Sequence, residues 1–172
     1  MEQNGVRIDI EALRQSSDIL TADMKLLEKE IHQLVGNEFN VGSPMQVGEV
    51  LFGQLKLDEK AKKTKTGQYS TSEDVLEKLR SKHPVVSKIL DYRGLKKLLS
   101  TYIDALPLLV NAKTGKVHTT YNQTVAATGR LSSTNPNLQN IPVRDELGRE
   151  IRKAFIPNDG ELLLSADYSQ IE

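Results

Sequence analysis

The chain has 172 residues, with 23 Lys and Arg balanced by 23 Asp and Glu, no cysteine and 5% aromatic residues. This composition excludes disulfides and thiolate metal sites, and any nucleic-acid binding must come from local clusters of basic residues. Because no apolar run approaches the roughly 20 residues that cross a bilayer and no signal-peptide pattern opens the chain, we expect no membrane contact and a cytoplasmic location. No obligate protein partner is evident from the sequence.

A long amphipathic helix is predicted for residues 10–35. Asp9 is a suitable N-cap and Gly36 is a suitable C-terminal stop. Between them, apolar residues recur at intervals of three, four and seven: Leu13, Leu20, Met24, Leu27, Ile31 and Leu34. A single narrow stripe predicts packing against one partner, such as an antiparallel helix.

Two shorter helices and a basic loop are predicted next. Ser43 and Pro44 open a helix that should end near Gly53, with Gln46 completing a capping box. Residues 70–73 open another helix by the same capping logic. Between them, residues 56–70 have few apolar anchors and predict a flexible basic loop, whose lysines are Lys56, Lys60, Lys62, Lys63 and Lys65.

The fourth predicted helix runs from Pro84 to about residue 106 or 110, and Pro107 should kink or end it. Its apolar stripe makes it the expected antiparallel partner of the first helix. Arg93 and Lys97 lie four residues apart on one of its faces. They could follow nucleic-acid phosphates, or they could belong to an ordinary solvated helix face.

The pattern changes at residue 111. The β-branched residues 117–121 predict a short strand, and residues 125–133 could supply its neighbour. A short helix is predicted for residues 147–154, and a turn at 157–160 leads to a final apolar strand at 162–166. The predicted fold class is therefore α+β, with an antiparallel helical part at 1–110 and a partial antiparallel sheet at 111–172.

Two polar segments are candidates for chemistry. Residues 128–142 are rich in groups that could donate to the acceptors of a nucleic-acid minor groove without choosing a sequence, although the same composition suits a surface loop. Asp167 follows the final apolar strand and could bind magnesium, or it could be a turn former or helix cap. Paired metal ions need a second carboxylate, and Glu172 is the nearest candidate.

Two motifs together resemble the family A DNA polymerases, especially the bacterial DNA polymerase I group. They are TGRLSSTNPNLQNIPV at residues 128–143 and SADYSQIE at residues 165–172. The resemblance continues upstream in GVRID at 5–9, STSEDVLEKL at 70–79, YRGLKKLLSTY at 92–102 and KTGKVHTTYNQ at 113–123. It therefore covers nearly the whole chain.

The resemblance implies a DNA-directed DNA polymerase of replication and repair. Residues 1–110 resemble its thumb, with a flexible tip at about 56–70, and residues 111–172 resemble the first part of its palm. It implies two Mg²⁺ ions as cofactors, with primer–template DNA and deoxynucleoside triphosphates as partners. Residues matching DNA contacts are Arg93, Lys97, Arg130, Asn137, Gln139 and Asn140, with Arg144 in the same block.

The resemblance also implies roles at the end of the chain. Asp167 matches the aspartate that binds both magnesium ions, and the Tyr168 carbonyl matches a further ligand. Gln170 and Glu172 match the nucleotide pocket, where Glu172 excludes a ribose 2′-hydroxyl.

The chain stops soon after Asp167, so we expect a fragment of a larger polymerase. With one metal-binding aspartate it should not hold magnesium stably or polymerise on its own. The final strand, left unpaired, should be frayed or self-associating. Two alternatives remain open: a stand-alone, non-catalytic module that binds duplex DNA, and a helical interaction protein without a nucleic-acid role.

Overall fold

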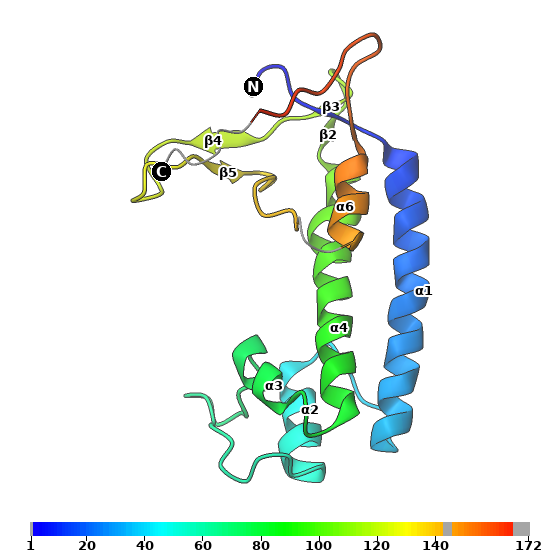
Figure 1. The fold of residues 1–172 in the computed structure, drawn as a ribbon, viewed down its shortest axis with the longest axis vertical. Coiled ribbons are helices and arrows are strands. Elements are labelled where there is room, and N and C mark those ends of the chain that lie inside the picture. Colours follow the sequence, from blue (N-terminus) through cyan, green and yellow to red (C-terminus); the bar gives the residue numbers. More distant parts are fainter. Residues whose placement is uncertain (1, 143–145, 167–172) are drawn as a thin grey trace. The chain divides into compact units, whose positions relative to one another are not determined.

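The computed structural model describes residues 2–142 and 146–166 (Figure 1). These residues form two compact units. Unit 1 draws on residues 1–17 and 99–172, and unit 2 consists of residues 18–98. The described ranges contain helices and short antiparallel strands joined by loops, which confirms the predicted α+β class. In these ranges no helix is both long and apolar enough to cross a membrane.

Helix α1, Ile10–Val35, has the predicted bounds. Asp9 caps it, because its Oδ1 accepts a hydrogen bond from the backbone N–H of Ala12 at 3.0 Å. It ends at Gly36, whose φ of 84° suits glycine. The prediction that Leu34 is part of the apolar stripe is wrong, since Leu34 is 39% exposed and Val35 is buried. A strict seven-residue repeat drifts by about 20° per heptad around a straight helix, which carries Leu34 off the buried face.

Unit 2 is built on the C-terminal part of α1 and on α4, Pro84–Leu98, which run antiparallel as predicted (Figure 1). The two helices are joined by an ion pair between Lys88 Nζ and Glu30 Oε2 at 2.6 Å. Three shorter helices complete the unit: α2 at Pro44–Gly48, the π-helix η1 at Glu49–Gln54 and α3 at Glu73–Leu79. Their buried side chains form one core with Ile31, Val86, Ile89 and Tyr92.

The start of α2 differs from the prediction in one contact. Ser43 Oγ accepts from the Gln46 N–H at 3.5 Å, and Pro44 occupies the first helical position. The Gln46 carboxamide does not complete a capping box. Its Oε1 accepts from the Asn40 N–H at 2.7 Å, so it satisfies the loop before the helix instead.

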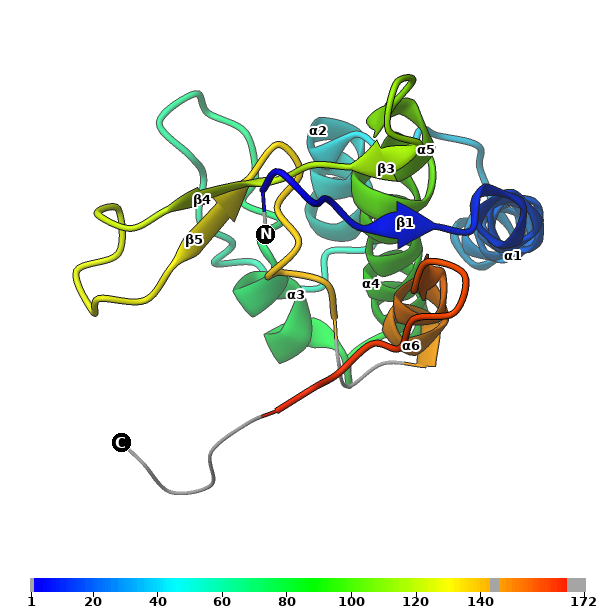
Figure 2. The ribbon, with the colours of Figure 1, turned by 90° about the horizontal axis from the view of Figure 1, so that it is seen from above.

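The described residues of unit 1 form three two-stranded antiparallel sheets. Strand β1, Arg7–Ile8, pairs with β6, Phe155–Ile156; β2, Val110–Asn111, pairs with β3, Lys116–Val117; and β4, Thr120–Asn122, pairs with β5, Ser132–Thr134. A further bridge between Val6 and Val117 places β1 beside β3 (Figure 2). The predicted strand at 117–121 is therefore split in two, and only the end of segment 125–133 pairs with it.

The helices of unit 1 are short. The π-helix η2, Leu99–Ile103, follows α4 directly, and α5, Ala105–Leu108, contains Pro107 and ends just after it. Helix α6, Glu146–Lys153, confirms the helix predicted at 147–154. Residues 162–166 are exposed and form no strand pair within the described ranges, so the segment is not a strand there, but this agrees with the expectation that it is left unpaired. An apolar segment without a neighbouring strand has no ladder of hydrogen bonds to hold it extended.

Candidate nucleic-acid interface

Four of the polar residues predicted to contact DNA lie in one segment of unit 1, just before strand β5 and in the loop after it. Arg130 lies two residues before β5, and Asn137, Gln139 and Asn140 lie in the loop that follows. All four side chains belong to exposed residues. We call this segment, residues 130–140, the β5 block. It can present a guanidinium and several carboxamides to a ligand.

Two carboxamides of the β5 block have fixed orientations. Gln139 Oε1 accepts from the backbone N–H of Ser133 at 3.0 Å, and Asn137 Oδ1 accepts from the backbone N–H of Gln139 at 3.1 Å. A backbone N–H can only donate, so the oxygen of each amide must face it. In the described part of the chain neither NH₂ group has a hydrogen-bond partner.

In unit 2 the predicted pair Arg93 and Lys97 occupy different environments. Arg93 is half-buried; its Nη1 donates to the carbonyl of Thr71, and its Nη2 donates to Thr71 Oγ1 at 3.1 Å. Burial lowers the pKa of Arg93 below its ordinary value. Lys97 is exposed one turn later. Arg93 therefore has a structural partner in the segment before α3, whereas the side chain of Lys97 is exposed to solvent.

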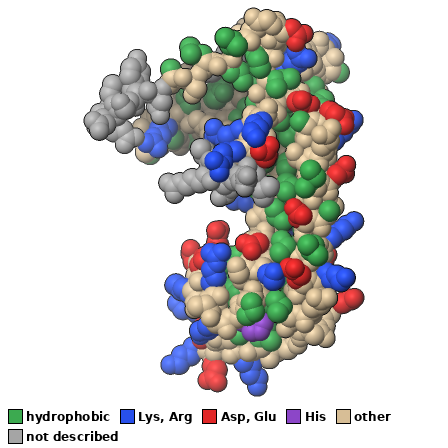
Figure 3. All heavy atoms as spheres, turned by 45° about the vertical axis from the view of Figure 1, so that its right-hand side comes forward, with side chains coloured by type: hydrophobic (Ala, Val, Ile, Leu, Met, Phe, Trp, Pro, Cys, Tyr) green, Lys and Arg blue, Asp and Glu red, His purple; other side chains and the backbone are tan. Residues whose placement is uncertain are grey.

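The lysine-rich segment 56–70 has no regular helix or strand, as predicted for a loop. It folds back on itself through hydrogen bonds from Thr64 N to Gln68 O at 2.7 Å and from Ser70 N to Lys62 O at 2.9 Å. Lys63 Nζ lies 4.8 Å from the centroid of the Tyr69 ring. Basic and acidic side chains are interspersed over the face shown in Figure 3.

Each of the three histidines has a structural partner. His32 Nε2 lies 2.8 Å from Phe39 O, His118 Nε2 lies 2.7 Å from Thr114 Oγ1, and His83 Nδ1 accepts from the backbone N–H two residues later. Over residues 2–142 and 146–166, no group of three or more His, Asp or Glu side chains is placed to hold a metal ion.

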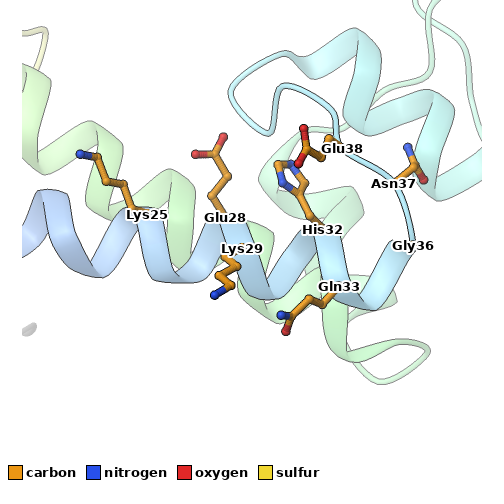
Figure 4. Close-up of a pocket in the computed structure, with 8 residues that line it drawn as sticks. All are labelled: Lys25, Glu28, Lys29, His32, Gln33, Gly36, Asn37 and Glu38. Carbon is orange, nitrogen blue, oxygen red and sulfur yellow. The ribbon is translucent and has the colours of Figure 1, made fainter.

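A surface groove lies at the C-terminal end of α1 (Figure 4). Side chains of both charges line it, and they favour no single class of ligand. The lining residues are Lys25, Glu28, Lys29, His32, Gln33, Gly36, Asn37 and Glu38.

The remaining predicted site residues lie outside the described ranges. They are Arg144, Asp167, Tyr168, Gln170 and Glu172. Their metal, nucleotide and DNA roles stay predictions.

The sequence interpretation missed the polar residues that support these sites. Thr71 holds Arg93; Ser133 is a buried member of the β5 block, and the buried Thr119 is hydrogen-bonded to it. The burial of Thr119 could have been predicted from strand alternation, because residues two apart in a strand face the same side and Val117 is buried. No such signal exists for Thr71, whose partner is 22 residues away.

Comparison with known proteins identifies the family. The model of DNA polymerase family A matches residues 10–172, which is nearly the whole chain. The chain belongs to DNA polymerase family A. This confirms the resemblance seen in the two polar motifs.

Individual family A members are similar along the whole chain. The chain is 54% identical over 172 residues to the thermostable DNA polymerase I of Thermus aquaticus and 54% identical over 173 residues to DNA polymerase I of Geobacillus stearothermophilus. It is 52% identical over 173 residues to DNA polymerase I of Synechocystis. These alignments cover 100% of the chain but only 21%, 20% and 17% of the relatives. The chain thus spans about a fifth of the length of the curated relatives it matches.

A solved structure supports the same assignment. The fold is similar to the POL domain of Pol1 from M. smegmatis in complex with DNA primer–template and dNTP, with a TM-score of 0.80 and 43% sequence identity. The match covers 91% of this chain and 27% of that structure's chain. At 43% sequence identity, this similarity supports membership of the same family as well as a shared fold.

Proposed function

We propose that this chain supplies the thumb and the first part of the palm of a bacterial DNA-directed DNA polymerase that acts in replication and repair. The thumb would be residues 1–110, with a flexible tip at 56–70, and the palm segment would be 111–172. The observation that carries the proposal is the exposed β5 block in a chain of family A. A similar fold holds primer–template DNA and dNTP in the M. smegmatis Pol1 structure.

The chemistry of the β5 block fits the minor groove of a primer–template duplex. That groove offers acceptors at nearly the same positions for every base pair, so donors can bind there without reading sequence. Arg130 and the NH₂ groups of Asn137 and Gln139 are such donors, and Asn140 extends the row. A polymerase must copy any sequence, and binding of this kind suits that requirement.

Phosphate contacts would come from basic side chains in unit 2. Lys97 is exposed on α4, and the lysines of segment 56–70 could follow the duplex backbone. Arg93 would contribute mainly by holding the segment before α3 in place, because its donors engage Thr71. Each phosphate contact releases counterions, so binding should weaken as salt is raised.

The nucleotidyl-transfer site is proposed from the family resemblance alone. Asp167 and the Tyr168 carbonyl would hold magnesium, which when bound supplies charge stabilisation for phosphoryl transfer. Gln170 and Glu172 would line the nucleotide pocket, and Arg144 would contact DNA. Because only one of the expected metal-binding aspartates is present, we propose that the 172-residue chain is inactive by itself. We also propose a cytoplasmic location.

The proposal can be tested by titrating the chain against a fluorescent primer–template hairpin at several salt concentrations. We expect weak binding that is independent of sequence and falls with salt. Lys97→Ala should reduce the slope of the logarithm of the binding constant against the logarithm of the salt concentration by about 1, the value of one phosphate contact. Lys25→Ala, which removes a matched exposed lysine on α1, should leave this slope unchanged. Binding that is absent at low salt, or unchanged by salt, would refute the interface.

A stand-alone module that binds duplex DNA is the second candidate. A chimera distinguishes this candidate from the polymerase: in it, the 172-residue chain replaces the matching part of the G. stearothermophilus DNA polymerase I. Template-dependent synthesis by the chimera, and none by the chain alone, would support the polymerase.

A further inference from the structure

Two buried hydroxyl groups lie in contact at the β5 block, one of them within it. Thr119, just before β4, is 7% exposed, and Ser133, in the middle of β5, is fully buried. Their oxygens are 2.7 Å apart. Burying hydroxyls in place of apolar groups is costly unless each is hydrogen-bonded. The pair must therefore hold other polar groups in return.

The contacts of the pair define a chain of hydrogen bonds. The N–H of Leu138 donates to Ser133 Oγ at 3.1 Å. Two hydroxyl protons are then shared among four short oxygen contacts, since each hydroxyl has one proton. If they occupy the two shortest, Ser133 donates to Thr119 at 2.7 Å, and Thr119 donates to the Pro136 carbonyl at 2.7 Å.

This chain fixes the loop that carries the carboxamides. It grips the loop at the carbonyl of Pro136 and at the amide of Leu138, on either side of Asn137. The turn also needs Asn135 at a φ of 53°, a left-handed conformation that asparagine tolerates better than most residues. With the loop held, the backbone N–H of Ser133 binds Gln139 Oε1.

Because the amide oxygens of Asn137 and Gln139 accept from backbone N–H groups, their NH₂ groups are the ends that can donate to a ligand. If the loop relaxed, the side chains of Asn137 and Gln139 could rotate and present their oxygens, which the acceptors of a minor groove would repel. A small error in the loop would thus reverse the polarity of the surface.

We propose that Thr119 and Ser133 are positioning residues, which hold the Asn137 and Gln139 carboxamides with their NH₂ groups directed to minor-groove acceptors. The inference rests on the proposed function. It assigns a ligand-binding role to two hydroxyls that touch no DNA themselves. It also names what they position, which is the donor end of each amide.

The test measures binding of the 172-residue chain to two primer–template hairpins. One has ordinary bases, and the other has 3-deazapurines near the primer terminus, which replace the minor-groove nitrogen acceptor with carbon. Wild type should lose about fivefold in affinity on the deaza hairpin, the value of one neutral hydrogen bond. Ser133→Ala should bind the ordinary hairpin about fivefold more weakly and lose little more on the deaza hairpin.

Matched variants separate positioning from folding. Thr119→Val keeps the shape of the side chain but removes its hydroxyl, and it should behave like Ser133→Ala. Thr119→Ser keeps the hydroxyl and should restore sensitivity to the deaza hairpin. Thr120→Val, at the exposed neighbouring position, should resemble wild type. A general loss of structure would weaken binding to both hairpins relative to wild type, whereas a loss of positioning alone weakens binding to the ordinary hairpin.

Each outcome decides one question. If wild type binds neither hairpin, the proposed function fails. If wild type binds and discriminates, but Ser133→Ala and Thr119→Val retain the full discrimination, the positioning role is overturned. Loss of discrimination in both variants, with rescue by Thr119→Ser, supports it.

Discussion

Replacing Arg93 by alanine should destabilise unit 2. The half-buried guanidinium donates to the carbonyl and to the hydroxyl of Thr71, a residue that is itself 6% exposed. Removing the side chain leaves both acceptors of Thr71 without this donor in a place where water has little access. The loss is therefore greater than that of a surface charge.

The expected size follows from the two hydrogen bonds. Bonds to a charged group contribute about 1.5–3 kcal/mol each. Part of this gain is offset by the desolvation of the guanidinium, which also lowers its pKa. A net loss of about 2–4 kcal/mol in the free energy of unfolding is expected, a large share of the roughly 5–15 kcal/mol that stabilises most domains.

Urea unfolding followed by circular dichroism measures this loss. Lys97→Ala, one turn along the same helix and exposed, is the matched control and should change stability by less than about 0.5 kcal/mol. Thr71→Val tests the partner and should reproduce part of the Arg93→Ala effect. If Arg93→Ala and Lys97→Ala are equally stable, Arg93 is not a structural clamp, and the reasoning from its contacts is refuted.

Three further outcomes are expected. Ile89→Ala, at a fully buried core position, should lose about 2–5 kcal/mol in urea unfolding; a loss below 1 would contradict the described core. Burial, and to a smaller extent the neighbouring Glu28, raises the pKa of Tyr92. The stability that the neutral Tyr92 side chain contributes is therefore complete below about pH 10 and is lost as pH rises through the raised pKa. Above pH 10, the unfolding free energy of Tyr92→Phe should fall less steeply than that of the wild type. Gly148→Ala would bring a Cβ within 2.8 Å of the Pro142 carbonyl carbon and should lower the free energy of unfolding by about 1–3 kcal/mol. The Cβ of Gly94→Ala meets no atom within 4 Å, so this variant should raise the free energy of unfolding by about 0.5–1 kcal/mol. Equal effects of the two variants in thermal or urea unfolding would refute the contact argument.

Local signals in the sequence predicted the helices well. The bounds of α1 followed from Asp9 and Gly36, because a cap and a left-handed stop act on neighbouring residues alone. The π-helices η1 and η2 were missed, since their hydrogen-bonding pattern leaves no distinct spacing of side chains over one turn. The final apolar segment is not a strand within the described ranges, in agreement with the expectation that it is left unpaired, because a strand needs a partner to hold it extended.

The candidate site was predictable by residue type but not by contact. The polar block around Arg130 was singled out by composition and resemblance, and the structure places it on one exposed segment. The hydroxyl pair of Thr119 and Ser133 was not, because 14 residues separate them and each looks like an ordinary strand residue. For Arg93 the sequence indicated a charge, but not the threonine that binds it.

The pairing of β1 with β6 has a consequence for the order of folding. It is reinforced by an ion pair between Arg7 and Asp159, which are 152 positions apart. Unit 2 is continuous in sequence, whereas unit 1 needs both ends of the chain. At a synthesis rate of about 5–20 residues per second, β1 would wait about 8–30 seconds on the ribosome for its partner strand.

We therefore expect unit 2 to become protease-resistant in nascent chains while the first residues are still cleavable. Ile8, buried in the folded chain, is exposed during that interval and would be open to capture by a chaperone. Pulse proteolysis of ribosome-stalled chains of increasing length would show two separate steps of protection. A single step at full length would mean that the two units fold together.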